Sequence, residues 1–462
     1  MTESERQITV PSNDPEARFR RLPGGFGRWT ASTLWRLWRL KRRRARWLAE
    51  NRAATAPYRK APRAALLPEG PGLLLGDFGG DTGISRAALY EAARLEAEYG
   101  PLERVDIARL GPGEAVGPPV ARAWFLLAPD SLARGLATLP PERLARAHRT
   151  ALWAWETPQL AGHWVFGFDV VHQVWTPSAF ARAAVAAAAP EEVTVGIRPH
   201  VPRLGPALPR AETLAALGAG TSAEEGAQDT AGPRDTMATG WAPIPKDAFL
   251  GLAVMDIRTC PARKNPWAHI AAWQAAFGTR EDRVLILKIR FSKRTAVVRR
   301  ELERMIGTAR NIRLVEHFLP DPVQAGLQAG ADVYLSLHRA EGYGLNIHEC
   351  LARGTPVVAT DWSANAEYGP AFAGYHPVPA RLVPYRDWTA HYPDAFLWAE
   401  ADLAHAARQL RALAARASHS APPDATAPNS GTSSGADTAG QASKTAGSKA
   451  SKTPGPTGVE AA

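Results

Sequence analysis

Short apolar runs alternate with segments of helical periodicity between residues 73 and 200. Such an order predicts strands that are each followed by a helix, which gives a parallel sheet covered by helices on both faces. The strands are expected at residues 73–76, 104–107, 123–127, 151–155, 170–175 and 193–197. The clearest helices are expected at residues 85–99, 141–147 and 178–188.

A second stretch of the same kind begins at residue 248. Its strands are expected at residues 249–255, 284–289, 312–316, 333–337 and 357–360. Helices are expected between and after them, at residues 266–277, 295–306, 322–328, 345–353 and 401–415. The predicted fold class is therefore α/β, with two doubly wound, Rossmann-like domains that face a cleft.

The pattern breaks between and beyond these stretches. Residues 204–244 are rich in small and polar residues, which predicts a flexible insertion or linker with one short helix near 211–217. Residues 418–462 have too little apolar surface to fold, and we expect them to be disordered. The two domains are therefore placed at 64–203 and 245–417, after a basic arm at 1–63.

The positive charge of the chain is concentrated in that arm. Of 462 residues with a net charge of +10, the first 63 hold 16 Lys and Arg against 5 Asp and Glu. Because the rest is nearly neutral, no nucleic-acid surface is expected on the body. The stretch from Thr33 to Glu50 (TLWRLWRLKRRRARWLAE) predicts a basic helix with tryptophans, typical of a helix on an anionic membrane surface. Packing on the protein's own body and RNA binding are the alternatives.

Other features of the sequence favour a cytoplasmic protein, held at the inner face of the membrane if the arm binds lipid. No apolar stretch is long enough to span a bilayer, and the N-terminus lacks the features of a signal peptide. The two cysteines, Cys260 and Cys350, form neither a disulfide framework nor a metal-ligand spacing. No metal site is predicted.

The segment from His338 to Glu349 (HRAEGYGLNIHE) has the features of a nucleotide-sugar site. Glu341 and Glu349 are eight positions apart, with a glycine turn between them and a predicted strand before them. Glycines let backbone N–H groups approach a diphosphate, and carboxylates accept hydrogen bonds from sugar hydroxyls. An acidic loop before a surface helix is the simpler alternative. The flanking strands favour the site, and His338 is included as a candidate because it leads into the loop.

Cations follow the first strand of the second domain, at Arg258, Arg263 and Lys264. At a strand–helix junction they would neutralise a diphosphate leaving group. The alternative is a solvated basic turn that caps the next helix, with Asn265 as N-cap and Pro266 at its first position.

Two weaker candidates lie in the first domain. A turn with Gly79, Gly80 and Gly83 follows the first strand and leaves N–H groups ready for a phosphate or an acceptor hydroxyl. Glu156 follows two tryptophans at the end of a predicted strand. It would orient or deprotonate an acceptor hydroxyl while the tryptophans stack on sugars. Core tryptophans beside a solvated carboxylate are the alternative.

These motifs together resemble a known family. LSLHRAEGYGLNIHECLARGTPVVATDWSANAEY is similar to the E-x7-E region of glycosyltransferase family 4, the group 1 retaining transferases with a GT-B fold. LGDFGGDTGISRAA resembles the family's first Gly-rich loop. ALWAWETPQL and VHQVWTPSAFARAAV resemble the acceptor-domain segment of bacterial polysaccharide-type members, and RKNPW and LWAEADLAHAARQLRAL also fit. The resemblance covers residues 73–200 and 248–415.

The resemblance implies an acceptor-side first domain and a nucleotide-sugar donor domain at 245–417. Glu341 would contact the donor sugar's hydroxyls near the reacting centre, and Glu349 would bind the ribose hydroxyls. Lys264 and Arg258 would pair with the diphosphate, and Lys264 is the safer assignment because similar members often have an apolar residue at 258. The sugar and diphosphate would lie against the backbone of Gly342, Tyr343, Gly344 and Leu345.

The resulting prediction is a retaining, metal-independent glycosyltransferase for polysaccharide biosynthesis. It would move a sugar from a nucleotide diphosphate sugar to a hydroxyl of a glycan or lipid-linked glycan, with no cofactor besides this substrate. The family's catalytic His or Asp of the first domain has no unambiguous counterpart here. The alternatives are a sugar-phosphate synthase or nucleotide-sugar epimerase on the same architecture, and a catalytically silent glycan-binding or membrane-docking scaffold subunit.

Overall fold

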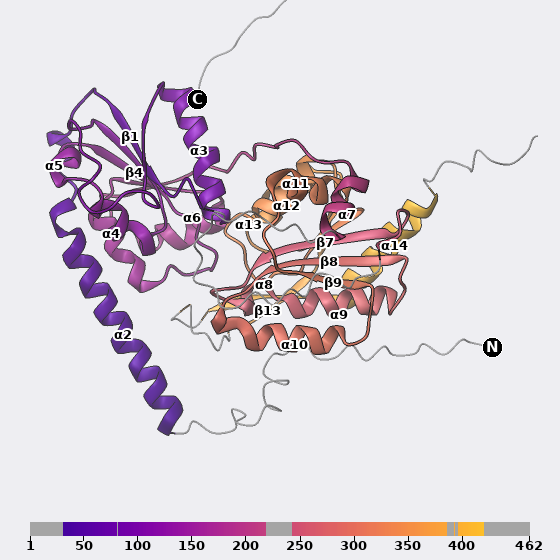
Figure 1. The fold of residues 1–462 in the computed structure, drawn as a ribbon. Coiled ribbons are helices and arrows are strands. Elements are labelled where there is room, and N and C mark those ends of the chain that lie inside the picture. Colours follow the sequence, from indigo (N-terminus) through magenta and orange to yellow (C-terminus); the bar gives the residue numbers. More distant parts are fainter. Residues whose placement is uncertain (1–30, 81, 219–242, 386–391, 393–395, 420–462) are drawn as a thin grey trace, which may run out of the picture. The chain divides into compact units, whose positions relative to one another are not determined.

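Two parallel six-stranded sheets with flanking helices organise the protein (Figure 1). The structure is a computed structural model that describes residues 31–80, 82–218, 243–385, 392 and 396–419. Each sheet is buried on both faces by apolar clusters, and one cluster of the N-terminal sheet also includes Cys260, Ala262 and Trp398. The prediction of two doubly wound, Rossmann-like domains is therefore confirmed. The tail that we expected to be disordered lies outside the described residues.

The N-terminal sheet has the strand order β2-β1-β3-β4-β5-β6. All its strands are parallel. From β1 the chain adds β2 on one side and then β3 to β6 on the other, so the order of strands switches between β1 and β3. Alternate residues of each strand face opposite sides, so Leu73 and Leu75 join one apolar cluster while Leu74 joins the other. The strands are β1 (Gly72–Gly76), β2 (Glu103–Asp106), β3 (Arg122–Leu126), β4 (His148–Leu152), β5 (Gln173–Thr176) and β6 (Thr194–Ile197). The helices are α3 (Gly83–Tyr99), α4 (Pro129–Ala137), α5 (Pro141–Leu144), α6 (Ala179–Ala186) and the 3-10 helix η3 (Gly162–Asp169).

The C-terminal sheet has the order β12-β11-β10-β7-β8-β9, which is the Rossmann order, with its reversal between β7 and β10. The strands are β7 (Phe249–Asp256), β8 (Arg283–Arg290), β9 (Ile312–Val315), β10 (Val333–Ser336), β11 (Val357–Thr360) and β12 (Tyr375–Val378). A separate antiparallel pair follows, β13 (Ala380–Pro384) and β14 (Leu397–Ala401).

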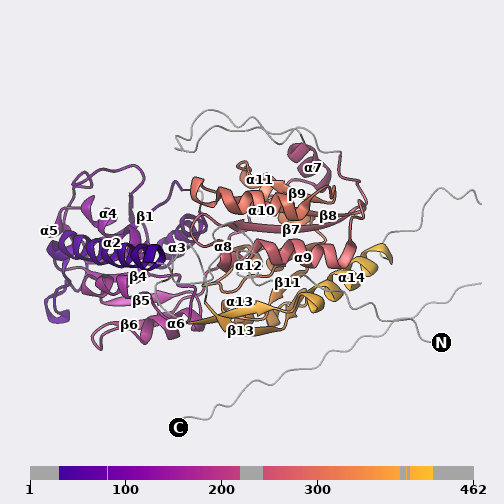
Figure 2. The ribbon, with the colours of Figure 1, turned by 90° about the horizontal axis from the view of Figure 1, so that it is seen from below.

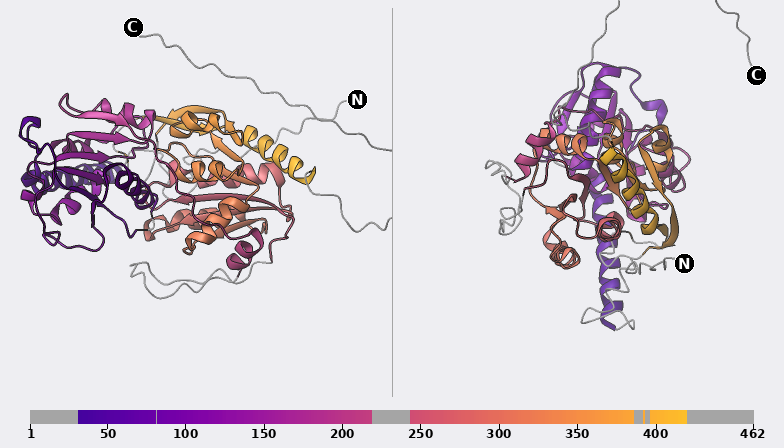
Figure 3. Two further views of the ribbon diagram at one scale, coloured as in Figure 1. Left: turned by 90° about the horizontal axis from the view of Figure 1, so that it is seen from above. Right: turned by 90° about the vertical axis from the view of Figure 1, so that its right-hand side faces the viewer.

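Helices cover both faces of this second sheet. One face carries α9 and α14, which pack on each other, and Figure 3 shows α14 in yellow. The other face carries α11 and α12, with α7 packed on α11. The helices are α7 (Arg210–Gly218), α8 (Pro261–Lys264), α9 (Pro266–Phe277), α10 (Ala296–Ile306), α11 (Asp321–Gly330), α12 (Leu345–Ala352), α13 (Ala364–Tyr368) and α14 (Leu403–His419), with short 3-10 turns η4 (Lys293–Thr295) and η5 (Gly369–Ala371).

The basic helix α2 (Ala31–Thr55) contains the predicted Thr33–Glu50 segment and continues beyond it. Its C-terminal part packs on α4 and η3 and leads into the 3-10 turns η1 (Ala56–Tyr58) and η2 (Arg63–Ala65). Figure 2 shows α2 beside α4. The Trp47 ring meets His163 and Phe166 edge-on, with centroids 5.4 and 5.7 Å apart. This end of the helix therefore packs on the protein's own body. Within the described ranges, no helix is both long and apolar enough to cross a membrane.

Several expectations differ from the structure. We expected a strand at 151–155, but β4 ends at Leu152, because the apolar run continues past the strand into a buried loop. By contrast, the short helix predicted near 211–217 of the linker is confirmed as α7, where Arg210 donates to Gly330 O at 2.8 Å and pairs with Asp332 at 2.9 Å. Residues 219–242 of that linker lie outside the described residues. The pattern of apolar and polar positions did not predict α4, η3, α13 or the β13–β14 pair.

Candidate functional site

Two of the predicted segments meet at the switch point of the C-terminal sheet. Strands β7 and β10 are parallel neighbours, so the segments that leave their carboxyl ends lie side by side. The first carries Arg263 and Lys264 on the single turn α8, and the second carries Glu341. Ligands of doubly wound sheets bind at such a point.

Glu341 is the centre of a buried cluster of charges. Lys264 Nζ donates a hydrogen bond to Glu341 Oε1, and Arg263 Nη1 donates to Oε2 at 3.2 Å. The other terminal nitrogen of Arg263 lies 3.3 Å from Glu156 Oε1. Burial by itself would raise the pKa of Glu341, but the two cations lower it to about 2. Burial lowers the pKa of Lys264, and Glu341 opposes that shift. The structure thus brings together four of the predicted residues.

The backbone around this cluster is held in unusual conformations. Asn265 has a φ of 52°, in the left-handed region, and this separates α8 from α9. In the alternative of a solvated turn, Asn265 would cap α9; it does hold the N-cap position, but neither amide atom has a partner among the described residues. Ser363, at a φ of 67°, accepts a hydrogen bond from Glu341 N at 3.0 Å. Arg263 is also anchored by donation to Ala340 O at 3.0 Å. Glu341 and Arg263 are therefore fixed by both backbone and side-chain contacts.

The glycine turn after Glu341 lies against the loop that precedes Glu156. A Cβ on Gly342 would lie 2.8 Å from the carbonyl oxygen of Trp155, so a side chain there would push the loop away. Ser178, which caps α6 as predicted by accepting from Ala181 N at 3.1 Å, also donates to Gly342 O at 2.9 Å. Gly344 takes a φ of +83° just before α12 begins at Leu345.

Tyr343 ties this turn to its surroundings. Its hydroxyl donates to the carbonyl oxygen of His200 at 2.6 Å. Tyr368 donates to the backbone oxygens of Tyr343 and Gly344 at 2.9 and 3.1 Å. Those two carbonyls are therefore already paired, and the N–H groups of the turn are what it offers to a ligand.

Glu349 lies on α12 with 3% of its side chain exposed. Arg86 donates to Glu349 Oε2 through both terminal nitrogens, at 3.3 and 3.4 Å, and Tyr90 donates to Oε1 at 2.9 Å. Gln328 donates to Oε2 at 2.6 Å. Sequence reasoning missed Arg86 and Tyr90. Their spacing of four, which places both on one face of α3, was the signal that could have drawn attention to them.

The remaining candidates of the donor domain have other partners. Arg258 pairs with the Asp256 carboxylate at 2.7 Å. His338 is buried, and both ring nitrogens have partners, Ser336 at 3.0 Å and Trp362 O at 3.4 Å. Burial lowers the pKa of His338, so its ring is neutral near pH 7.

The tryptophans before Glu156 do not form a sugar-stacking surface. Trp153 and Trp155 are 0% and 3% exposed and belong to the N-terminal core, so that prediction is wrong. Trp155 also donates to Gln159 O at 2.8 Å, which holds the loop beyond β4 in a turn. Among the described residues of this loop, Glu156 is the one whose side chain contacts the Glu341 cluster, through Arg263.

The Gly79 loop lies beside two carboxylates. Gly80 is so close to Asp77 that a Cβ there would lie 2.6 Å from its carboxylate, and Asp106 Oδ2 would be 3.4 Å from a Cβ on Gly79. Gly83 begins α3, whose N-terminus is capped by Thr82 through Ser85 N at 3.1 Å. Of our two predicted ligands for this loop, the negative charge disfavours a phosphate and favours a hydroxyl.

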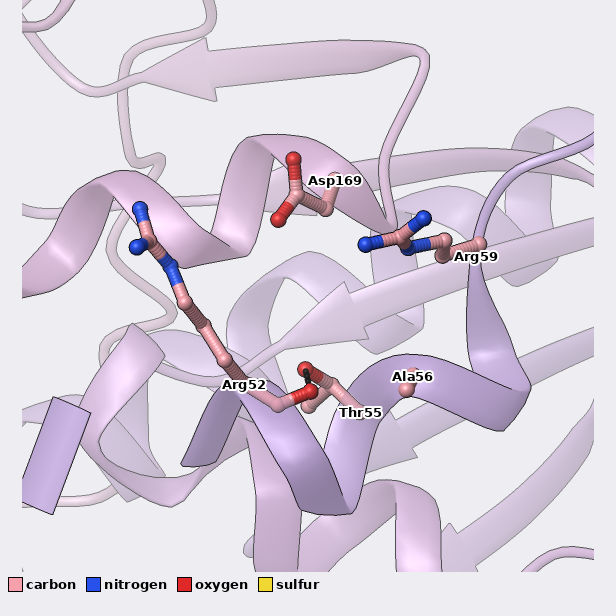
Figure 4. Close-up of a pocket in the computed structure, with 5 residues that line it drawn as sticks. All are labelled: Arg52, Thr55, Ala56, Arg59 and Asp169. Atoms are coloured by element: carbon pink, nitrogen blue, oxygen red, sulfur yellow. Dashed lines mark hydrogen bonds between the residues drawn. The ribbon is translucent and has the colours of Figure 1, made fainter. Parts of the chain in front are cut away.

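A pocket of about 170 Å³ lies in another part of the N-terminal domain (Figure 4). It contains none of the predicted site residues; Arg52 and Arg59 stand on either side of Asp169, with Thr55 and Ala56 below. Within the described parts of the chain, no three His, Cys, Asp or Glu side chains are grouped so that they could hold a metal ion.

No family model matches the chain, and no curated protein matches it. It is similar to the crystal structure of Anabaena Alr3699/HepE in complex with UDP and glucose, with 15% identity and a TM-score of 0.43 over 65% of this chain and 83% of that one. It is also similar to α,α-trehalose 6-phosphate synthase from Burkholderia multivorans, with 14% identity and a TM-score of 0.40 over 66% and 65%. Likenesses this slight carry no argument about activity.

Proposed function

We propose that the protein is a retaining glycosyltransferase. It moves a sugar from a nucleotide diphosphate sugar to a hydroxyl of a glycan or lipid-linked glycan. The observation that carries the proposal is the buried cluster of Glu341, Arg263 and Lys264 at the switch point of the C-terminal sheet. Retention of the anomeric configuration is proposed from the sequence resemblance.

The charges of the cluster suit the donor half of this reaction. When the bond from the sugar to the diphosphate breaks, negative charge grows on the leaving oxygen. Lys264 and Arg263 are held where they can stabilise that charge, because burial strengthens their field and fixed contacts remove the cost of reorganisation. Glu341 stays ionised and accepts hydrogen bonds from the sugar hydroxyls. Glu349 does the same for the ribose. The proposal needs no metal, since the two cations supply the positive charge.

The acceptor is assigned to the N-terminal side. Arg263 joins Glu156 to Glu341, so a hydroxyl that contacts Glu156 would lie near the donor's reacting carbon. The Asp77 and Asp106 carboxylates at the Gly79 loop would accept hydrogen bonds from further acceptor hydroxyls. Glu156 would orient the attacking hydroxyl and take its proton.

The test is binding and turnover with a panel of nucleotide sugars. A thermal-shift screen would find the donor, because a ligand of the native state raises the melting temperature. Replacing Glu349 with Ala should then abolish donor binding by calorimetry. Glu303→Ala, a surface carboxylate on α10 with 41% of its side chain exposed, should bind as the wild type does. Unchanged affinity in the Glu349 variant would remove that role.

A catalytically silent glycan-binding or scaffold subunit is the second candidate. The internal pairing of both Glu341 and Glu349 favours it, because the donor would have to displace protein groups. Transfer to an acceptor or hydrolysis of any nucleotide sugar by the purified protein would discard it.

We also propose an anionic membrane surface as a partner. On the described part of α2, Arg43 and Arg46 are exposed, while Trp47 packs inward. Binding through this part would therefore be electrostatic rather than insertion of the tryptophan. The full chain with Arg43→Ser and Arg46→Ser should co-sediment less with phosphatidylserine vesicles than the wild type does, and high salt should weaken both. Equal sedimentation would remove the helix from the proposal.

A further inference from the structure

The carboxylate that we assign to the ribose already accepts four hydrogen bonds from the protein. An ionised carboxylate has about four lone-pair positions. At Glu349, Oε2 accepts from two N–H groups of Arg86 and from the amide of Gln328, while Oε1 accepts from the hydroxyl of Tyr90. Burial, followed by the Glu349 charge, raises the pKa of Tyr90, so its hydroxyl keeps its proton and acts as the donor.

The donors at Glu349 come from helices of two different domains. Gln328 lies on α11 of the same domain, and its amide also donates to Asn346 at 3.2 Å, which fixes it beside α12. Arg86 and Tyr90 lie on α3 of the N-terminal domain. The Arg86 side chain is 31% exposed, so water can replace Glu349 as its partner. The α3 pair can therefore leave without disturbing α12, whereas Gln328 cannot.

Like a ribose, the pair presents Glu349 with hydrogen-bond donors. A ribose offers two neighbouring hydroxyl donors to a carboxylate, and the α3 pair offers a hydroxyl and a guanidinium edge. Both sets cannot occupy the same lone pairs. We propose that Arg86 and Tyr90 occupy the ribose position at Glu349, and that a nucleotide binds by displacing them. This inference rests on the proposed function, and it makes α3 the element that sets nucleotide affinity.

Replacing Arg86 or Tyr90 should change nucleotide affinity in the opposite direction to replacing a residue that contacts the nucleotide. A contact that is present in the free protein and lost in the complex opposes binding, because it stabilises only the free state. Removing it tightens binding. Residues that touch the nucleotide would instead weaken binding when they are replaced.

The experiment measures dissociation constants of the full-length protein for UDP, GDP, ADP, CDP and dTDP, each tested separately. Tyr90→Phe removes one hydroxyl and Arg86→Met removes the guanidinium. Each variant should bind its preferred nucleotide more tightly, by roughly tenfold for a hydrogen bond to a charged group. Tyr99→Phe is the matched control, since it removes the same group from the other end of α3, where the ring is 40% exposed and packs on Trp124 at 4.9 Å. Its affinity should equal that of the wild type.

The second part of the experiment measures binding of a nucleotide that has no ribose hydroxyls. The 2′,3′-dideoxy form of the preferred nucleotide has no groups to take the place of the α3 pair, so Tyr90→Phe should not tighten its binding. Weaker or unchanged binding of the ordinary nucleotide by both variants overturns the inference, as does equal tightening of the dideoxy form. If neither the wild type nor any variant binds a nucleotide, the proposed function fails and this inference fails with it. Circular dichroism and the melting temperature confirm that each variant is folded.

Discussion

The N-terminal sheet buries Arg149 at the amino end of β4, whereas the C-terminal sheet buries Glu341 beyond the carboxyl end of β10. Arg149 donates to backbone carbonyls, among them Tyr58 O, Leu144 O at 2.7 Å and Val170 O at 3.3 Å. Burial lowers its pKa to about 10. Glu341 is paired with two cations, one of which, Lys264, keeps 20% of its side chain exposed.

The difference shows what makes a buried charge a candidate for chemistry. The guanidinium of Arg149 donates to carbonyls of the chain, and these hydrogen bonds form a joint that fastens the turn after α2 to the sheet. Around Glu341 the charges of both signs are gathered at a switch point, with one cation still open to a ligand. Burial alone therefore does not identify a site. A site is identified by its position at the carboxyl end of a strand and by a charged group, such as Lys264, that can exchange its protein partner for a ligand.

The largest expected effect is at the Arg149 joint. Arg149→Met leaves several buried carbonyls without a donor, so the free energy of unfolding should fall by about 3 kcal/mol. Hydrogen exchange should rise in η1, while nucleotide-sugar affinity per folded molecule stays unchanged. Arg146→Met is the control: this exposed arginine donates to Ala65 O at 2.9 Å, and its loss should change stability by less than about 0.5 kcal/mol. Equal effects in urea titrations would contradict the distinction.

The next effect is at the Glu341 cluster and should reach activity. Arg263→Lys keeps the charge but loses the planar fork that contacts Glu156 and Glu341 together. We expect the free energy of unfolding to fall by about 2 kcal/mol and turnover of the nucleotide sugar to fall by roughly 100-fold. Arg280→Lys alters a similar fork on Asp282 that is 60% exposed, and it should leave both quantities nearly unchanged. Full activity in the Arg263 variant would separate the cluster from catalysis.

Each domain also holds a buried neutral histidine, which gives a smaller effect with acid. Burial lowers the pKa of His172 and of His269 to about 4. His172 Nδ1 accepts from Arg149 N at 3.1 Å, and His269 Nε2 accepts from Leu337 N at 3.1 Å, so neither has room for a second proton.

A folded-state pKa below the unfolded value of 6.5 means that the unfolded chain binds more protons at mildly acidic pH. The stabilisation from each histidine is therefore complete above pH 6.5 and is lost as the pH falls toward 4. Between pH 7 and 5.5 we expect the free energy of unfolding to fall by roughly 1 kcal/mol from His269, with the same sign for His172. Gln at either position should flatten the dependence measured by urea titration, and a slope unaffected by both variants would contradict the assignment.

The smallest effect tests the backbone that separates α8 from α9. Asn265→Gly should leave the free energy of unfolding within about 0.5 kcal/mol of the wild type, because glycine adopts the left-handed region freely. Asn265→Ala should lower it by about 1 kcal/mol, since alanine does not. Equal values for the two variants would show that the conformation is not under strain.

Much of the fold could be predicted because both sheets are buried on two faces. Their strands then become continuous apolar runs, as at 249–255 and 333–337, and a run of that kind is visible without a partner. Helix caps such as Ser178 were visible for a similar reason, since the cap bond is local. The end of β4 was not visible, because Trp153 and Trp155 extend the apolar run although they pack in a loop. The β13–β14 pair was missed because β13 is largely exposed and has no apolar run, although β14 is buried from Trp398 to Ala401.

The sequence by itself determined the two α/β domains, the acidic motif of Glu341 and Glu349, and the cations at Arg263 and Lys264, because each depends on contacts between chain neighbours or on strand order. Only the tertiary structure decided how those charges are paired. Arg86 and Glu349 are 263 positions apart, and Arg263 reaches Glu156 as well as Glu341. Such pairs form because folding brings distant strand ends together and a buried charge needs an opposite one nearby. The periodicity of apolar and polar residues along the chain predicts neither which distant segments meet nor which buried charges pair.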